Sequence, residues 1–277
     1  METTEITDHN ERVIAATRQV LLEVFYLLEE FNDSLILVGG WVPVMIIPGA
    51  VDKHVGTIDV DLAINDRTLV EIGSETMEAI LVTNGYQHGG EPGRFIRKIY
   101  IEGQPINVPV DFLSSEYRYV PENEFLDITG ISTITAPGCE ISFDANEKVT
   151  LSGILPNGAR YETEIKSAGI AALIVMKAHA MKIRSKTKDA YDIWFCLANH
   201  PDGVDGVAKA FKPHLEKTSV ETALVLLSEY FASIDARGPS DVVKEDGTTD
   251  TDYQAFLKQD SFQRVKALLT SLEFKEG

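Results

Sequence analysis

Cysteine and long apolar runs are both scarce in this sequence. Its two cysteines, Cys139 and Cys196, have neither Cys-x-x-Cys nor Cys/His ligand spacing, which excludes a disulfide-rich secreted fold and a structural zinc site. No apolar run approaches the roughly 18 residues that a membrane span needs. The first residues, METTEITDHNER, are acidic and polar where a signal peptide has a basic and then an apolar region. We therefore expect a soluble, cytoplasmic protein with reduced thiols and no membrane partner.

Positive charge is also scarce. The chain has 25 Lys and Arg against 43 Asp and Glu, which gives a formal net charge of −18. A surface this acidic repels phosphates, so any contact with nucleic acid depends on a local basic patch. The 277 residues are 44% apolar, which is enough for a substantial core and for one or two domains, and which excludes a disordered or fibrous protein.

The N-terminal part of the chain carries both helical and strand patterns. Helical spacing of apolar residues predicts helices over 13–31, from Gly39-Gly40 through Ile47, and over about 68–83, where Asn84-Gly85 ends the helix. Alternating or apolar runs predict strands over 35–38, 58–64, 94–101 and 106–113, and further antiparallel strands in 131–166. The turn at 102–104 joins two of these strands, which predicts a hairpin.

Beyond residue 167 only helical patterns occur. They predict helices over 168–183, 188–198, 204–211, 220–233 and 262–272, with a solvated, turn-rich gap at 237–252. We therefore expect an α+β protein with two domains. Residues 1–167 form a mixed sheet with flanking helices, and residues 168–277 form a helical domain.

Two carboxylates lie two residues apart on the predicted strand 58–64. Side chains at this spacing leave the same face of a strand about 7 Å apart, so Asp59 and Asp61 could share one or two Mg²⁺ ions. Asp111, on a later strand, points away from the apolar residues on either side of it and could complete a two-metal centre for phosphoryl transfer. A pair of this kind also occurs by chance on half-exposed strands, so the pair alone does not establish a metal site.

Gly39-Gly40 follows a predicted buried strand and opens a helix. Bare backbone N–H groups at such a turn can receive a phosphate, although the same glycines also suit any tight turn. The chain has no Walker-type Lys-Ser/Thr nearby and no complete GxGxxG fingerprint. The order of the motifs is what makes the pair informative: Gly-Gly, then Thr57-x-Asp59-x-Asp61, then Asp111.

A basic stretch lies in the first predicted helices of the C-terminal part. Lys177 and Arg184 are seven residues apart, so they share a helix face from which both could bind a triphosphate. Three further lysines extend this basic island: Lys182, Lys186 and Lys188. The island is equally explained by a solvated helix end. Asp189 and Asp192 could orient Lys177 or Arg184, supply a base for an incoming hydroxyl, or cap the next helix, which is the simplest role for Asp189.

These motifs together resemble the DNA polymerase beta-like nucleotidyltransferase superfamily, whose Gly-Gly turn, D-x-D strand and later single Asp are matched by Gly39-Gly40, Asp59-Val60-Asp61 and Asp111. Within it, the chain is most similar to the AbiEii-type nucleotidyltransferases, which include toxins of bacterial toxin–antitoxin systems. That similarity depends on the helical stretch 174–184 and on Lys188-Asp189-Ala190-Tyr191-Asp192. The matched motifs extend from about residue 35 to residue 200.

The resemblance implies a nucleotidyltransferase domain over 1–167 and transfer of a nucleoside monophosphate from an NTP to an acceptor hydroxyl, with release of pyrophosphate. Its catalytic residues and its Mg²⁺ (or Mn²⁺) ligands would be Asp59, Asp61 and Asp111. The nucleotide would be bound by Gly39, Gly40, Thr57, Lys177, Arg184 and Asp192. The partners would be the nucleoside triphosphate, an acceptor RNA such as tRNA or a small molecule, and an antitoxin protein where a cognate one exists.

Some residues depart from the family pattern or stay outside the expected site. Lys53 and His54 lie further upstream of Thr57 than the arginine that family members often carry, and Asn107-Val108-Pro109-Val110 stands where a lysine is frequent. His54, His88 and His179 lack metal spacing and are expected to be ordinary surface or packing residues, and Trp41 and Trp194 are expected to be core anchors.

Three other functions are compatible with parts of the pattern. An antibiotic nucleotidyltransferase would use the same carboxylates on a small hydroxylated acceptor. A non-catalytic nucleotide-binding regulatory module would not need all three carboxylates. A glycosyltransferase could use the D-x-D for a metal ion and a nucleoside diphosphate, but it would not explain the basic helix together with Asp189 and Asp192.

Overall fold

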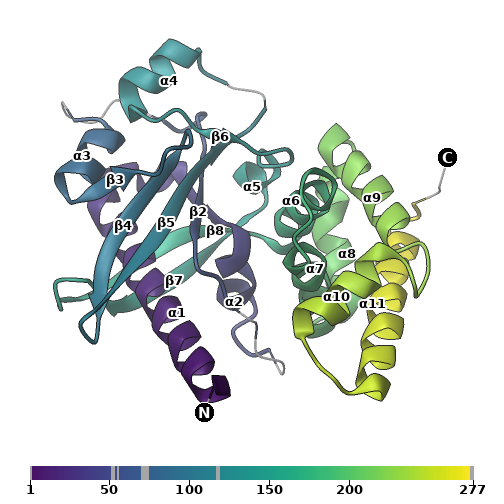
Figure 1. Ribbon diagram of the computed structural model, residues 1–277. Helices are drawn as coiled ribbons and strands as arrows, with labels where there is room; N and C mark the ends of the chain where they lie inside the picture. Colours follow the sequence, from purple (N-terminus) through teal and green to yellow (C-terminus); the bar gives the residue numbers. More distant parts are fainter. Residues whose placement is uncertain (1, 51–53, 55, 70–74, 117–118, 275–277) are drawn as a thin grey trace. The chain divides into compact units, whose positions relative to one another are not determined.

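The protein is described by a computed structural model that covers residues 2–50, 54, 56–69, 75–116 and 119–274. The chain divides into two compact units (Figure 1). The first unit contains Met1–Trp41, Gly56–Ala136 and Asn146–Ser167, and the second contains Val42–Val55, Pro137–Ala145 and Ala168–Gly277. The segments 42–55 and 137–145 thus belong to the same unit as the C-terminal helices.

The first unit is built on a mixed sheet. Its strands are β1 (Leu35–Val38), β2 (Val60–Ile64), β3 (Tyr86–His88), β4 (Arg94–Ile101), β5 (Gln104–Ser114), β6 (Ile134–Thr135), β7 (Asn146–Ile154) and β8 (Arg160–Ala168). Their order is β3-β4-β5-β2-β1-β8-β7, with β6 paired to β5. β1 and β2 are antiparallel, whereas β2 with β5 and β1 with β8 are parallel. The expected α+β class with a mixed sheet is confirmed.

Helix α1 (Glu2–Leu27) packs along this sheet and contacts β7, β5 and β4 (Figure 1). Its core face is apolar at helical spacing, and Val20, Leu21 and Val24 are completely buried. The central strands β2 and β5 bury Val60, Leu62, Val110 and Phe112 in the same way. Two short helices, α3 (Met77–Thr83) and α4 (Glu122–Thr129), complete the unit together with the 3₁₀ turns Glu29–Ser34 and Gly39–Trp41.

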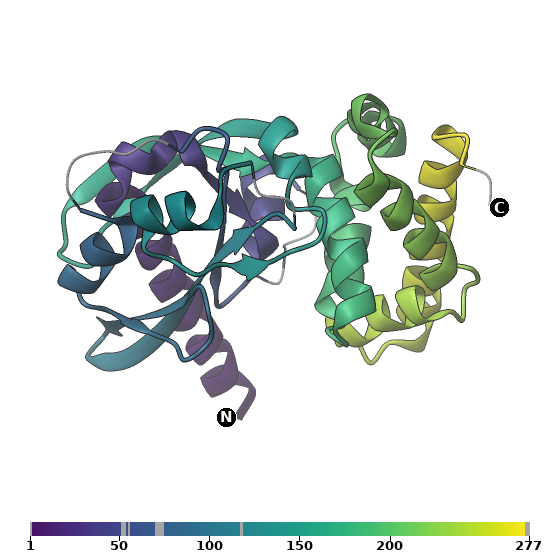
Figure 2. The ribbon, with the colours of Figure 1, turned by 90° about the horizontal axis from the view of Figure 1, so that it is seen from above.

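The second unit is helical, and Figure 2 shows its C-terminal helices in green to yellow. Its helices are α2 (Val42–Ile46), α5 (Ile141–Asp144), α6 (Ile170–Ile183), α7 (Lys188–Asn199), α8 (Gly203–Phe211), α9 (Thr218–Tyr230), α10 (Arg237–Asp246) and α11 (Thr251–Ser271). α6 is apolar on nearly all sides and contacts α7, α8 and α9, as expected of a helix at the centre of a bundle. No strand occurs from 169 to 274, as the sequence predicts.

Several predicted boundaries in the first unit are wrong. The helix predicted over 13–31 begins at Glu2, because polar residues continue a helix that the apolar periodicity does not reveal, and Phe31 lies in the 3₁₀ turn. The strand predicted from Ile58 begins at Val60, and Ile58 is 61% exposed instead of facing the core. The helix predicted over 68–83 is observed only as α3 from Met77, and residues 70–74 of that prediction lie outside the described residues.

The prediction for 131–166 is correct in part. β7 and β8 flank the predicted turn at Pro156-Asn157-Gly158, but β6 is parallel to β5, and β8 is parallel to β1. α4 and α5, which lie in or beside this region, were not predicted, since helices of 8 and 4 residues are too short to show a clear period.

The solvated gap predicted at 237–252 is also wrong. It contains α10, which buries Gly238, Pro239 and Val242, and the guanidinium of Arg237 donates to backbone carbonyls of α6 and its C-terminal end. α11 begins at Thr251, well before the predicted start at 262, and the Asp250 carboxylate caps it by accepting from two backbone N–H groups. α11 has little apolar periodicity, and α10 is amphipathic but mostly polar, with Gly238 and Pro239 in its first turn. Tertiary contacts and a cap therefore contribute to both helices.

The structure also bears on three sequence predictions, which concern membrane spans, the cysteines and the tryptophans. No helix among the residues that the structure describes is both long and apolar enough to cross a membrane. Cys139 and Cys196 are buried, free thiols. Trp41 and Trp194 are each 3% exposed, which confirms that they are core residues.

Candidate active site

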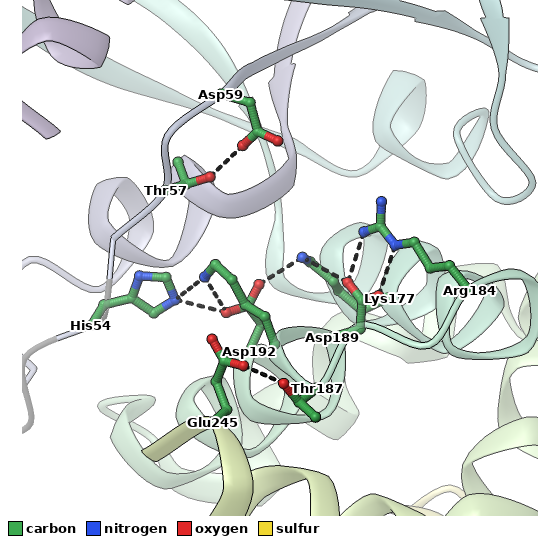
Figure 3. A network of polar contacts seen from close by, with 10 residues as sticks. His54, Thr57, Asp59, Lys177, Arg184, Thr187, Asp189, Asp192 and Glu245 are labelled. Atoms are coloured by element: carbon green, nitrogen blue, oxygen red, sulfur yellow. Dashed lines mark hydrogen bonds and ion pairs between the residues drawn. The ribbon is translucent and has the colours of Figure 1, made fainter. Parts of the chain in front are cut away.

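The predicted carboxylates of the first unit come together where β2 and β5 run side by side. These strands are parallel neighbours, and the register pairs Asp61 with Asp111. Paired residues on adjacent strands point to the same face of a sheet, so the two carboxylates share that face. Asp59 lies just before β2, and its carboxylate accepts a hydrogen bond from the Thr57 hydroxyl, as Figure 3 shows.

The Gly-Gly turn lies directly against these residues. Gly39 has a φ of +72°, and a methyl group added there would lie 1.9 Å from Asp61 Oδ2. A methyl group added at Gly40 would lie 2.8 Å from the Thr57 side chain. Glycine is therefore required at both positions for Asp61 and Thr57 to approach the turn. The structure thus places Gly39 against Asp61 and Gly40 against Thr57.

Arg94 is a residue of this region that the sequence reasoning missed. Its Nε donates to Asp111 Oδ1 and its Nη2 to Asp111 Oδ2, both at 2.7 Å, and its Nη1 lies 3.0 Å from Glu91. The hydrogen bonds that Arg94 donates to Asp111, together with the charges of Asp111, Glu91 and Asp59, raise the pKa of Arg94 further above its usual value. The signal was available, because a hairpin turning at 102–104 pairs Arg94 with Asp111.

The oxygen donors here fit a hard divalent cation in part. Asp59 and Asp61 offer carboxylate oxygens of the kind that Mg²⁺ and Mn²⁺ prefer, and Asp61 is positioned by Gly39. Asp111 is different, since both of its oxygens accept from Arg94. Within the described ranges no group of three or more His, Cys, Asp or Glu side chains is arranged to hold a metal ion. Asp59 and Asp61 therefore have the donor chemistry that such a cation would need.

The predicted basic residues of the second unit form a separate cluster of charges on α6 and α7. Lys177 Nζ lies 3.1 Å from Asp189 Oδ1 and 2.6 Å from Asp192 Oδ2. Arg184 donates to both oxygens of Asp189 at 2.8 Å. The two aspartates and Lys177 are buried, whereas the Arg184 side chain is 45% exposed. Asp189 therefore orders both cations, and the predicted capping role is wrong because Thr187 is the N-cap of α7 and no side chain caps it.

His54 and Lys188 complete this cluster, as Figure 3 shows for His54. His54 Nε2 and Lys188 Nζ each lie 2.8 Å from Asp192 Oδ1. The His54 side chain is 2% exposed and meets the Phe195 ring edge-on. His54 thus has a specific charged partner, and Lys188 belongs to this cluster instead of a solvated island. Lys53 lies outside the described residues. His54 is 138 residues from Asp192 in the chain, so no local pattern could reveal the contact.

The electrostatics of the cluster follow from burial and pairing. Burial opposes ionisation of Asp192, but the charge of Lys177 and the hydrogen bond from His54 outweigh it and hold the Asp192 pKa well below its usual value. Burial likewise disfavours charged Lys177, yet Asp192 and Asp189 raise its pKa. Burial lowers the pKa of His54, and the nearby Lys188 adds to this effect. In this cluster both carboxylates are therefore ionised, Lys177 and Arg184 are positively charged, and the His54 imidazole is neutral near pH 7.

A glycine turn thus follows the buried strand β1, an Asp-x-Asp motif spans the start of β2, and a buried lysine–aspartate cluster lies on α6 and α7. The family model described as "Nucleotidyl transferase AbiEii toxin, Type IV TA system" matches residues 21–270, and the chain belongs to this family. The match covers both units. No curated protein and no solved structure gives a significant match to the chain.

Proposed function

We propose that this protein transfers a nucleoside monophosphate from a nucleoside triphosphate to the hydroxyl of an acceptor RNA, with release of pyrophosphate. Family membership supports a nucleotidyltransferase of a type IV toxin–antitoxin system, with a nucleotide substrate and an antitoxin as partner. The observation that carries the proposal is the register that places Asp61 beside Asp111, with the Asp61 carboxylate against Gly39.

Each unit contributes residues of suitable chemistry. A divalent cation, Mg²⁺ or Mn²⁺, held by Asp59 and Asp61 would stabilise the negative charge that develops on the transferred phosphoryl group. The backbone N–H groups at Gly39-Gly40 are suited to phosphate oxygens. In the second unit, Lys177 and Arg184 carry positive charge of the kind that binds phosphate groups. Asp192 and Asp189 hold these two side chains in place.

The first test is transfer of label from each of the four α-labelled triphosphates to total tRNA. We expect Asp61→Asn to lower the transfer rate at least about a hundredfold, because the lost charge stabilisation amounts to several kcal/mol. Asp33→Asn is the matched control, since the Asp33 side chain is 93% exposed in the same unit, and it should retain wild-type activity. Wild-type transfer by Asp61→Asn would refute the proposed site.

A second test concerns the acceptor. Lys182 and Lys186 are exposed, so they are available to bind RNA phosphates on an otherwise acidic protein. With RNA as acceptor, Lys182→Glu/Lys186→Glu should raise the KM for RNA at least about tenfold, more steeply as salt is lowered, and leave nucleotide affinity unchanged. Lys209→Glu/Lys212→Glu, which changes two exposed lysines of α8 and its C-terminal end, is the control. A KM that changes neither with salt concentration nor with these lysine substitutions would indicate a small hydroxylated acceptor.

A further inference from the structure

The guanidinium of Arg94 occupies both oxygens of the carboxylate that a second metal ion would need. The two hydrogen bonds to Asp111 are 2.7 Å each, the parallel fork geometry of the strongest arginine–carboxylate pairs. Asp111 is 5% exposed, so water competes little for these bonds. Each oxygen of Asp111 uses one lone pair to accept from Arg94, so a further cation would have to bind a remaining lone pair beside the guanidinium charge.

The backbone and two glycines hold Arg94 in this position. Gly93 has a φ of +72°, and its carbonyl accepts from the Phe112 N–H at 2.8 Å, which anchors the start of β4 to β5 beside Asp111. A methyl group added at Gly93 would lie 2.6 Å from the Phe112 carbonyl oxygen. A methyl group added at Gly89 would lie 2.4 Å from Arg94 Cγ, so the absence of a side chain there makes room for the arginine. The ion pair is therefore part of the fold.

Charge favours the same conclusion. Arginine remains protonated at any pH at which a protein is folded, so Arg94 is a permanent positive charge among Asp111, Glu91 and Asp59. A second divalent cation beside it would be repelled by the guanidinium and would compete with it for Asp111. A single cation on Asp59 and Asp61 avoids this competition.

We propose that Arg94 takes the place of a second metal ion: it neutralises and positions Asp111, so that the centre binds one divalent cation through Asp59 and Asp61. This inference rests on the proposed nucleotidyltransferase function. Arg94 is a positioning residue in this arrangement, and Asp111 acts on the acceptor side through its fixed place beside Asp61, not as a ligand of the cation. It follows that the positive charge of Arg94 lowers the affinity of the centre for Mn²⁺.

The test is Mn²⁺ binding to the full chain, measured by the loss of the free-Mn²⁺ electron paramagnetic resonance signal. We expect wild type to bind one Mn²⁺ and Asp61→Asn to bind none. Arg94→Gln removes the opposing charge and should tighten Mn²⁺ binding at least about tenfold. The double variant Arg94→Gln/Asp111→Asn removes the ion pair without changing net charge, and its Mn²⁺ affinity should return to within about threefold of wild type.

Arg97→Gln is the matched control. Arg97 lies on the same strand and also forms a forked pair, with Glu23, at 2.7 and 2.9 Å, but it is not near the three aspartates in the register. It should leave Mn²⁺ affinity unchanged. If Arg94→Gln fails to fold, judged by its circular dichroism, the double variant carries the test.

The outcomes separate this inference from the proposed function. An unchanged Mn²⁺ affinity in Arg94→Gln would show that the guanidinium does not oppose the cation and would overturn the inference. A loss of affinity of tenfold or more in the double variant would show that Asp111 is a ligand and would also overturn it. If wild type binds no Mn²⁺, or Asp61→Asn binds it equally well, the metal centre of the proposed function fails, and this inference fails with it.

Discussion

Two regions of the molecule differ in their electrostatics. We call them the carboxylate end of the sheet, which contains Asp59, Asp61 and Asp111, and the α6–α7 cluster, which contains His54, Lys177, Arg184, Lys188, Asp189 and Asp192. In the first, Asp111 is paired with the Arg94 guanidinium, and the charges of Glu91 and Asp59 also act on Arg94, so the carboxylates around this guanidinium outnumber it. In the second, two aspartates are paired directly with three side-chain cations, and these aspartates are buried. The first region therefore groups carboxylates of the kind that could hold a cation, whereas the second is held together by its own pairs.

This difference separates stability from function. Removing one partner of a buried ion pair leaves an uncompensated charge, which costs several kcal/mol of folding free energy. Removing a carboxylate from a region with excess negative charge relieves repulsion and leaves the fold intact. Substitutions in the α6–α7 cluster should therefore lower stability, and those at the carboxylate end should lower ligand binding and turnover.

The largest expected effect is on Lys177. Lys177→Met keeps the length of the side chain but leaves Asp189 and Asp192 short of one cation, so the free energy of unfolding should fall by about 3–5 kcal/mol. Lys217→Met is the control, because Lys217 pairs with Asp144 in the same unit but both side chains are one third or more exposed. It should cost less than about 1 kcal/mol. Urea denaturation of both variants at constant pH measures the difference.

Equal and small losses for the two lysine variants would mean that the cluster does not depend on its pairs. In that case the contrast between the two regions disappears. A variant of Lys177 that folds should also bind the triphosphate more weakly, by about 1.5–3 kcal/mol, the range for a hydrogen bond to a charged group. Isothermal titration with a non-hydrolysable triphosphate measures this loss separately.

The second prediction concerns Gly39 at the carboxylate end. Gly39→Ala and Gly158→Ala both place alanine at a positive φ, +72° and +87°, which costs about 1–2 kcal/mol in each case. Only the first also meets a neighbour, since a methyl group at Gly39 would lie 1.9 Å from Asp61 and one at Gly158 has open space around it. Gly39→Ala should therefore lose Mn²⁺ binding and transfer activity, whereas Gly158→Ala should lose stability alone.

The measurements are Mn²⁺ titration and label transfer for both glycine variants, with stability from thermal unfolding. If Gly39→Ala retains wild-type Mn²⁺ affinity, the close contact between the turn and Asp61 does not position the carboxylate. If Gly158→Ala loses activity as well, the effect is one of general stability and not of the carboxylate end.

The same two regions differ in how far the sequence predicts them. Short sequence patterns predict the carboxylate end. They are the buried strand before Gly39-Gly40 and the alternation that puts Asp61 on the face opposite Val60. Such patterns follow from the two-residue period of a strand and need no knowledge of distant contacts. Even Arg94 could be found, because the hairpin turn determines which residues pair across β4 and β5.

The sequence predicts only part of the α6–α7 cluster. The seven-residue spacing predicts that Lys177 and Arg184 share a helix face, which is wrong because α6 ends at Ile183 and Arg184 has an extended backbone. Asp189 and Asp192 are close along the chain, so their association could be expected. His54 could not be found, since it reaches Asp192 from a segment that packs with the second unit although it precedes β2. α10 was missed for a similar reason, because its hold on the C-terminal end of α6 through Arg237 is a tertiary contact. Local patterns do not record such contacts.

The smallest expected effect tests His54 by pH. The His54 imidazole faces Asp192, Lys188 and, at longer range, Lys177, and it packs against the Phe195 and Tyr191 rings. Burial lowers its pKa in the folded protein below the value of about 6.5 that it has in the unfolded chain. As pH falls through about 6.5, the unfolded chain therefore binds the proton first, and stability declines by at most about 1.4 kcal/mol per pH unit until the folded form is protonated as well.

Between about pH 7.5 and pH 5.5, His54→Asn should show a smaller loss of unfolding free energy than wild type, by on the order of 1 kcal/mol. His88→Asn is the control, because the His88 side chain is 64% exposed and pairs with Glu78 in the first unit. Urea denaturation at the two pH values gives the difference for each variant. Identical pH dependence in wild type and His54→Asn would show that the imidazole is protonated as readily in the folded protein as in the unfolded chain, and that Asp192 outweighs burial at this position.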